Sequence, residues 1–301
     1  MDRTRAVADE ALLEVAGFDV AWMEGGVEVR RPLGDAVGVA FEDVPPVRDF
    51  PSYRGQRHFP GLYWSATTGR HVGFESWLER DHAMLLDFDP QVTGFASQPF
   101  WLCWRDETTR RGRSHAPDYF ARAVDGTGLV IDCRPVDRVD ERSAVAFSAT
   151  RQVCESVGWA YRLVGELDPI RVANLRWLAG YRHPRYAAAA GAVAAVRAAF
   201  AVPAPLVAQA AMVGDPIEVL PVVFHLLWSG VLQADLSRPL GDLTLVERRY
   251  GRWVDCCRAG CWLSGTGCGS RTGSTPSSGW RGPWSASSTI TGPRAWSCSL
   301  T

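Results

Sequence analysis

Two carboxylates and an arginine stand close together in HAPDYFARAVDGTGLVIDCRP, residues 115–135. The segment contains two short apolar runs joined by VDGTG, a pattern that predicts a β-hairpin. Side chains alternate along a strand, so Asp132 and Arg134 are expected on the same face. Neighbouring carboxylates can hold a divalent cation, and an arginine beside them can neutralise charge that develops on a phosphate. The chemistry that this set predicts is metal-dependent hydrolysis of a phosphodiester.

The position of Asp118 relative to this pair depends on the register of the hairpin. A register in which partner numbers sum to 252 places Asp118 opposite Arg134 and gathers the apolar side chains on the other face. A shift by one residue sets Ala121 opposite Asp132 and spoils the alternation. The favoured register leaves a three-residue loop that needs a glycine in the left-handed region, which VDGTG supplies. We therefore predict that the three charged residues share one side, the alternative being an exposed face with ordinary salt bridges.

The composition is that of a folded globular protein with room for two domains. The chain has 301 residues, 47% of them hydrophobic, and a net charge of -1. It contains no lysine, so all 32 basic residues are arginines. The near-neutral balance argues against a protein that coats nucleic acid through charge alone. The arginine-rich stretch RDETTRRGRSH, residues 105–115, is either a phosphate-binding patch or a solvated loop.

The location is predicted from what the chain lacks. No apolar run approaches the length of a spanning helix, and MDRTRAVADE has no apolar signal-peptide core. We therefore expect a cytoplasmic protein with no membrane partner and no disulfide framework. Five of the eight cysteines lie after residue 255, in a Gly-, Ser- and Trp-rich tail without hydrophobic periodicity. We interpret residues 249–301 as a frame-shifted, disordered tail.

Hydrophobic periodicity predicts the elements that carry the charged residues. The first 70 residues combine a helical start, TRAVADEALLEV, with strand-like text. An amphipathic helix is expected over residues 74–88, ended by Pro90, and one strand over 92–104, VTGFASQPFWLCW. A helix over 140–158 and a buried strand, WAYRLV, follow the hairpin. A strand, a crossover helix and a second strand in that order predict an α/β fold with a mixed sheet and helices on its faces.

The residues after Gly165 have a different pattern. Several short apolar segments are typical of helices, and they lead into VLQADLSRPLGDLTLV, which has strand-turn-strand character. Short helices followed by a hairpin favour an α-rich, winged-helix-like domain. A helical packing domain without a ligand fits the pattern equally well.

The residues at the hairpin also carry a family resemblance. PDY at 117–119 and IDCRP at 131–135 resemble the PD-(D/E)xK, restriction-endonuclease-like nuclease superfamily. Together with ESWLERDHAMLLDFDPQVTGFASQPF and HAPDYFAR, they look like the TnsA-like endonuclease subunit of heteromeric transposases. The resemblance covers roughly residues 45–245. It implies a restriction-endonuclease-like core that cuts one DNA strand at the transposon ends.

The resemblance assigns roles to individual residues. The acidic residue of the family's first helix falls best on Glu79, with Glu75 one turn earlier as the fallback. Asp118 and Asp132 then match the metal-binding aspartate and the second acidic position, so Glu79, Asp118 and Asp132 are the implied ligands of Mg²⁺, with Mn²⁺ as the substitute. Arg134 stands where the family has lysine. Arginine keeps its proton at any working pH, so it can act only as an electrostatic clamp.

Three further side chains could belong to this set. Gln98 lies at a strand entry, where it touches the site or makes a cap or hairpin hydrogen bond. His115 precedes Asp118 and either approaches a phosphate or stays in an exposed loop. His82 lies on the same helix face as Glu79 and poses the same choice.

The resemblance also implies an organisation and a set of partners. Predicted parts are a strand-bearing lead-in over 1–70, a nuclease domain over 71–168 and a winged-helix-like, partner-binding domain over 169–248. The implied partners are DNA, a DDE-type transposase subunit and an ATPase regulator subunit. Two alternatives remain open: a stand-alone repair or restriction nuclease, and a catalytically inactive assembly subunit, which Arg134 and the unusual tail suggest.

Overall fold

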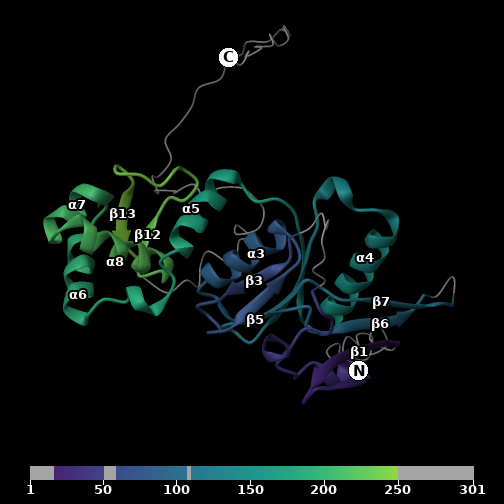
Figure 1. Ribbon diagram of the computed structural model, residues 1–301. Helices are drawn as coiled ribbons and strands as arrows, with labels where there is room; N and C mark the ends of the chain where they lie inside the picture. Colours follow the sequence, from purple (N-terminus) through teal and green to yellow (C-terminus); the bar gives the residue numbers. More distant parts are fainter. Residues whose placement is uncertain (1–16, 51–58, 107–109, 250–301) are drawn as a thin grey trace, which may run out of the picture. The chain divides into compact units, whose positions relative to one another are not determined.

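The computed structural model describes residues 17–50, 59–106 and 110–249 (Figure 1). The predicted helical start lies outside the described residues, and so does the predicted tail apart from Arg249. Among the described residues the elements form an α/β arrangement with several sheets, which confirms the predicted class. The predicted domain boundaries stay predictions.

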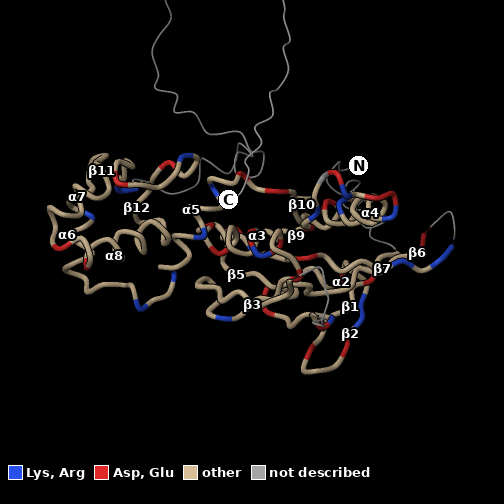
Figure 2. The backbone as a smooth tube through the Cα atoms, turned by 45° about the horizontal axis from the view of Figure 1, so that its top comes forward, with Lys and Arg blue, Asp and Glu red and all other residues tan. Residues whose placement is uncertain are grey.

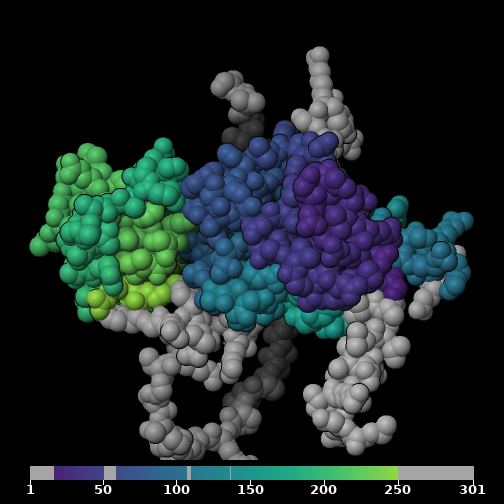
Figure 3. Space-filling view, turned by 90° about the horizontal axis from the view of Figure 1, so that it is seen from below, coloured from purple at the N-terminus to yellow at the C-terminus, as the bar shows by residue number. Residues whose placement is uncertain are grey.

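The first sheet joins the lead-in to residues beyond 100. Its strands are β1 (Phe18–Glu24), β2 (Val27–Pro32), β6 (Trp101–Arg105) and β7 (Gly112–His115). They run in the order β2-β1-β6-β7, and each neighbouring pair is antiparallel. Figure 3 shows the purple N-terminal residues packed against the blue residues that follow them. The lead-in is therefore part of the framework beside the hairpin.

The second sheet contains the hairpin. Its strands are β5 (Val92–Ser97), β8 (Tyr119–Ala123), β9 (Gly128–Cys133) and β10 (Ala160–Val164), in the order β10-β9-β8-β5. Strands β5, β8 and β9 pair antiparallel, whereas β9 and β10 are parallel. Helix α4 (Glu141–Ser156) makes the crossover between the parallel pair, as the periodicity predicted. The sheet is therefore mixed.

Two helices cover opposite faces of this sheet. Helix α3 (Trp77–Phe88) packs with one apolar cluster, which includes Tyr119, Ala121 and Ile131 of the hairpin. Helix α4 packs with the other cluster, which includes Phe120 and Val130. Odd-numbered and even-numbered hairpin residues therefore face different helices, as strand alternation requires.

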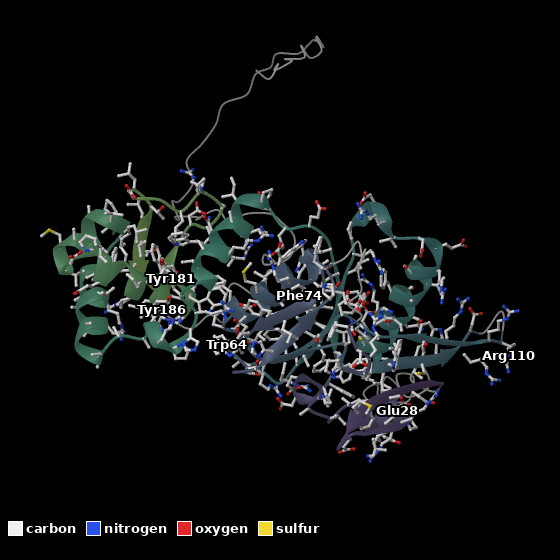
Figure 4. The ribbon with its side chains drawn as sticks, viewed as in Figure 1. Glu28, Trp64, Phe74, Arg110, Tyr181 and Tyr186 are labelled. Atoms are coloured by element: carbon white, nitrogen blue, oxygen red, sulfur yellow. The ribbon has the colours of Figure 1, made fainter. Side chains whose placement is uncertain are left out.

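Helix α3 begins later than the apolar stripe predicts. Phe74 ends strand β4 (His71–Phe74), which pairs with β3 (Gly61–Trp64), so Phe74 is not helical. Ser76 is the N-cap, and its side chain accepts a hydrogen bond from the Glu79 N–H. Figure 4 labels Phe74 at the end of the strand that leads into the helix.

The predicted single strand over 92–104 is wrong. The segment forms β5 and β6, which belong to different sheets. The chain turns at Gln98, whose φ of 44° lies in the left-handed region and ends the extended run. Its backbone N–H donates to the Asp118 carbonyl (3.0 Å), and its carbonyl accepts from the Val47 N–H (2.9 Å). These bonds hold a conformation that a glutamine rarely adopts.

Four short helical segments lie between the longer elements. Phe41 is fully buried and contacts the rings of Phe100, Phe120 and Trp159, so the loop that carries it belongs to the core. The segments are α2 (Leu33–Ala36), η1 (Phe41–Asp43), η2 (Val136–Arg138) and η3 (Pro184–Tyr186).

The C-terminal elements confirm the predicted helices and the strand-turn-strand segment. They are α5 (Pro169–Ala179), α6 (Ala190–Ala199), β11 (Ala204–Pro205), α7 (Leu206–Val213), α8 (Pro216–Trp228), β12 (Leu232–Ala234) and β13 (Leu245–Arg248). The three strands form an antiparallel sheet in the order β11-β13-β12. Figure 2 shows α7 in tan along its length, because it carries no Lys, Arg, Asp or Glu.

In the part of the chain that the structure describes, no single helix is long and apolar enough to cross a membrane. Helices α7 and α8 meet the length and composition criteria only when taken together, and they are bent by 117° at their junction.

Polar contacts connect the C-terminal helices to the elements around the hairpin. The Arg176 guanidinium binds both carboxylate oxygens of Asp81 on α3 (3.1 and 2.8 Å). Arg182 donates to the carbonyl of Trp64 (2.8 Å), whose ring lies 4.9 Å from the ring of His183. Figure 4 labels Trp64 together with Tyr181, which precedes Arg182. Helix α3 is thus held by the sheet and by Arg176 of the C-terminal segment, and Arg182 holds β3.

Candidate active site

The hairpin register differs from the predicted one by two residues. Partner numbers sum to 250, as for Tyr119 and Ile131, and not to 252. A shift of two keeps every side chain on its face, so apolar alternation does not distinguish the two registers. The loop sets the register. Gly126 has a φ of 87°, and the Ala123 N–H donates to the Thr127 carbonyl, so the three-residue loop spans residues 124–126 and lies one residue earlier than the predicted register requires.

The corrected register changes the partner of Asp118. Continued by one residue, it sets Asp118 opposite Asp132, where Arg134 was predicted. The Asp118 Oδ2 accepts a hydrogen bond from the Cys133 backbone N–H (2.7 Å), which holds the carboxyl at the end of the hairpin. The sequence-predicted carboxylates on the two strands are therefore neighbours.

Asp118 is partly exposed although its carboxyl lies deep in the protein. Burial raises the pKa of Asp118 well above its usual range, and the Glu79 and Asp132 carboxylates raise it further. The hydrogen bond from Cys133 and the charge of Arg134 oppose this rise. A deep acidic group that solvent still reaches, crowded by like charges, is a common property of active sites.

Glu79 lies on α3, and its charge acts on Asp118. Its Oε2 accepts from the Glu75 N–H (2.7 Å) and its Oε1 from the Ser76 hydroxyl (2.8 Å), a variant of the capping box in which the N–H before the N-cap replaces that of the N-cap itself. The side chain is buried, and burial raises the pKa of Glu79. Each carboxylate oxygen keeps a second lone pair, so the cap leaves Glu79 able to bind another group.

Asp132 faces the α4 side of the sheet, together with Val130. Its carboxylate contacts the His115 Nε2 (2.9 and 3.0 Å) and accepts a hydrogen bond from the Tyr161 hydroxyl (2.8 Å). Asp132 is almost fully buried, so these partners stabilise it. His115, predicted as a loop residue or a phosphate contact, thus lies at the end of β7 and is held by Asp132.

Arg134 follows β9 and is exposed. Its backbone N–H donates to the Val164 carbonyl (2.8 Å), which extends the parallel pairing by one residue. Its charge lowers the pKa of Asp118, so the guanidinium lies within electrostatic reach of that carboxyl. This position suits a cation at the rim of the site.

Arg48 is a component of the site that sequence reasoning missed. Its Nη2 donates to the Glu75 Oε2 (2.9 Å), and its Nε donates to the Gln98 Oε1 (2.9 Å). The positive charge of Arg48 also opposes the raised pKa of Glu79. Arg48 precedes Gln98 by 50 residues in a loop, and no spacing in the sequence signals the contact.

The acidic side chains do not form a ready-made metal cage. Among the described residues, no three His, Cys, Asp or Glu side chains lie close enough together to hold a metal ion as they stand. Asp118 and Glu79 are nevertheless two oxygen donors, and the Glu79 charge raises the pKa of Asp118. The Glu75 Oε1 is buried without a hydrogen-bond partner among the described residues. Mg²⁺ is commonly held by one or two carboxylates plus waters and substrate phosphates, and this donor set fits that pattern.

Two other histidines, His82 and His225, contact backbone carbonyls. The His82 Nε2 contacts the Gly165 carbonyl (2.8 Å) from inside the core, and burial lowers the pKa of His82. The His225 Nδ1 contacts the Tyr181 carbonyl (2.8 Å). Neither belongs to the carboxylate group at the hairpin.

Comparison with known proteins adds no relative to this picture. No protein-family model matches the chain, and no curated protein matches it. The function is therefore inferred from the geometry of the site and from the sequence motifs.

Proposed function

We propose that the protein is a metal-dependent DNA endonuclease subunit that resembles TnsA and cuts one strand at transposon ends. The observation that carries the proposal is the environment of Asp118, a deep but accessible carboxyl beside Glu79, Asp132 and Arg134. Crowded carboxylates ionise together only when a cation neutralises them. A hairpin between acidic residues, in a mixed sheet with a helix on each face, supports a restriction-endonuclease-like core.

Asp118 and Glu79 are the proposed ligands of Mg²⁺, or of Mn²⁺ in its place. Asp132 was the third predicted ligand, but His115 and Tyr161 hold its carboxylate on the α4 side of the sheet, so it fits better as the residue that positions His115. When bound, the metal polarises the phosphate and makes water a stronger nucleophile at neutral pH. Its binding also stabilises the ionised forms of the two carboxyls.

The arginines around these carboxyls supply the positive charge that the reaction needs. Arg134 is exposed at the rim, where it can contact a phosphate of the DNA as the negative charge grows. It replaces the lysine of the superfamily pattern and keeps its proton, so it stabilises charge and does not accept a proton.

The C-terminal segment supports the partner-binding part of the proposal. From α6 onward its elements follow the order helix, strand, helix, helix, strand, strand, with an antiparallel sheet in the order β11-β13-β12. This order is that of a winged-helix module. Helix α7 has no charged side chain, which favours a protein partner over DNA for this helix. The DDE-type transposase and the ATPase regulator remain proposals from the family resemblance.

Strand cleavage tests the proposal directly. The full chain is incubated with a plasmid carrying a transposon end, with Mg²⁺ or Mn²⁺, with and without candidate transposase and ATPase subunits. We expect nicking that needs the metal and that falls at least about 100-fold in Asp118→Asn, which keeps the size of the side chain. Cleavage by the chain alone would favour a stand-alone nuclease. Metal-independent nicking, or equal nicking by Asp118→Asn, would overturn the proposal.

A catalytically inactive assembly subunit is the second candidate. The specific observation in its favour is that Arg134 replaces lysine while hydrogen bonds engage both oxygens of Asp132. In that case Asp118→Asn would leave both transposition in cells and assembly with the partners at native levels. Loss of transposition with assembly retained would instead support the nuclease.

A further inference from the structure

Two buried polar atoms beside the carboxylates have no hydrogen-bond partner among the described residues. They are the Nε2 of Gln98 and the Oε1 of Glu75. Only about 1% of Gln98 is exposed, so water reaches it poorly. A buried N–H without an acceptor costs about 1–3 kcal/mol, and native proteins rarely keep one without a reason.

The orientation of the Gln98 amide is fixed by its neighbour. Arg48 has only donors, so the atom that faces its Nε must be the amide oxygen. The Nε2 therefore points away from Arg48. If the amide were turned over, the Gln98 Nε2 would face the Arg48 Nε, and two donors cannot form a hydrogen bond.

The backbone of Gln98 is held as firmly as its side chain. Its φ of 44° places it in the left-handed region, where a non-glycine residue is strained. Bonds to the Asp118 carbonyl and from the Val47 N–H keep it there. The first of these bonds also ties Gln98 to the residue that carries the proposed function.

We propose that Gln98 contacts the substrate in the candidate active site, and that Arg48 is its positioning residue. The Gln98 Nε2 is buried in the free chain, so DNA binding must expose it before it can donate to a non-bridging oxygen of the phosphodiester. The ligand must be a hydrogen-bond acceptor, because Nε2 is a donor, and this excludes a cation at this atom. The positive charge of Arg48 favours an anionic acceptor.

This inference rests on the proposed function and adds a contact that the sequence motifs do not assign. Glu75 complements it, since its unpaired Oε1 is an acceptor held by the same guanidinium. A donor for the phosphate and an acceptor for the hydrogen of a water therefore lie on either side of Arg48. Arg48 bonds to both side chains, so it holds the donor and the acceptor near each other.

The test compares Gln98→Met with Gln152→Met in single-turnover cleavage by the full chain with its partners. Gln152 is the control, because it is exposed on α4 and lies outside both the carboxylate group and the C-terminal segment. We expect Gln98→Met to cleave about 100-fold more slowly, the effect of losing one donor to the reacting phosphate. Gln152→Met should cleave at the native rate.

Phosphorothioate DNA separates a contact from a structural role. Replacing one non-bridging oxygen at the mapped nick by sulfur weakens a hydrogen bond from Nε2, so one diastereomer should be cleaved more slowly by the native chain. In Gln98→Met that difference should disappear, because the donor is absent. A merely structural Gln98 would leave the difference unchanged, and this outcome would overturn the inference.

Arg48 is tested by Arg48→Met and Arg48→Lys against Arg70→Met. Arg70 is the control, because it pairs with Asp43 at the surface. We expect Arg48→Met to lose about 10- to 100-fold in rate, as for other residues that orient a functional group, with Arg48→Lys recovering part of it. A native rate in Arg48→Met would overturn its positioning role.

The outcomes distinguish this inference from the proposed function. If Asp118→Asn is inactive while Gln98→Met cleaves at the native rate, the nuclease stands and the Gln98 contact falls. If the native chain never nicks DNA, both fall. Gln98→Glu serves where Gln98→Met does not fold, because glutamate can still pair with Arg48 but has no donor, and it is expected to lose the same activity.

Discussion

Helix α3 carries a buried carboxylate near each end, and the fold surrounds the two in different ways. Near its C-terminus, Asp87 accepts four hydrogen bonds from neutral donors, namely the hydroxyls of Tyr63 and Ser65 and the N–H groups of Ala66 and Thr67. In its first turn, Glu79 accepts two side-chain or backbone bonds and is crowded by other acidic groups. Asp87, which stabilises the fold, has a hydrogen-bond donor for each of its lone pairs. Glu79, which we propose as a metal ligand, has fewer donors, and a cation would stabilise its charge.

The largest effect on stability is expected at the saturated end. Asp87→Ala leaves four donors without an acceptor, two of them on the buried residues Tyr63 and Ser65, so we expect the free energy of unfolding to fall by about 3–5 kcal/mol. Urea denaturation measures this change. A loss below about 1 kcal/mol would mean that Asp87 is not a structural group, and the comparison between the two ends of α3 would fail.

Asp118→Asn is expected to have the opposite effect on stability. The native pKa of Asp118 is raised above the unfolded value of about 3.9, so the stability that the protonated form provides is complete below that pH and is lost as pH rises through the native pKa. Asparagine avoids this loss, so the variant should be more stable than the native chain at neutral pH, by about 0.5–2 kcal/mol. Urea unfolding from pH 4 to pH 8 with a chelator measures it. A variant that is less stable across this whole range would contradict the charge crowding.

Arg134→Lys tests whether the residue at this position acts only as a positive charge. Lysine can give up its proton near a metal-activated water, whereas arginine cannot, so we expect single-turnover nicking to rise about tenfold in this variant. Arg134→Met should nick more slowly than the native chain, because the cation is gone. Because Arg134 is exposed, both variants should unfold within about 0.5 kcal/mol of the native chain. Equal nicking in all three chains would remove Arg134 from the site.

The smallest effect is expected at His82, another buried ionisable group on α3. Burial lowers its pKa below the unfolded value of about 6.5, so the folded chain binds fewer protons and loses stability as pH falls from 6.5 through the native pKa. His82→Gln keeps a donor for the Gly165 carbonyl, so its stability at pH 8 should differ from the native value by no more than about 1 kcal/mol. Thermal unfolding at pH 5 and pH 8 should show a smaller acid loss in the variant. An equal loss would assign the acid sensitivity to other groups.

Much of the fold could be predicted because it depends on local patterns. Alternation and turn residues predict the hairpin, its three-residue loop and the parallel strand after α4, and all three are present. The register escaped prediction because apolar alternation repeats every two residues, so registers that differ by two bury the same side chains. The turn of the chain at Gln98 escaped because a left-handed glutamine depends on bonds from Val47 and Asp118, which are remote in sequence.

The candidate site was predicted only in part, for a related reason. Glu79, Asp118 and Asp132 were identified from their residue types and from the motif resemblance, and in the structure the charges of Glu79 and Asp132 both act on the Asp118 carboxyl. Arg48 was missed because a loop arginine without a motif has no spacing that links it to a site. Its contact with Gln98 arises from tertiary packing alone.

Gln98 stands where the chain leaves one sheet for another, and this position couples the two sheets thermodynamically. Any ligand that prefers the observed conformation of Gln98 must, by linkage, also stabilise the exit into β6 and the pairing of β6 with β1. Amide hydrogens of β1 should therefore exchange more slowly when DNA is bound. The N-terminal strands would then report on occupancy of a site that they do not line.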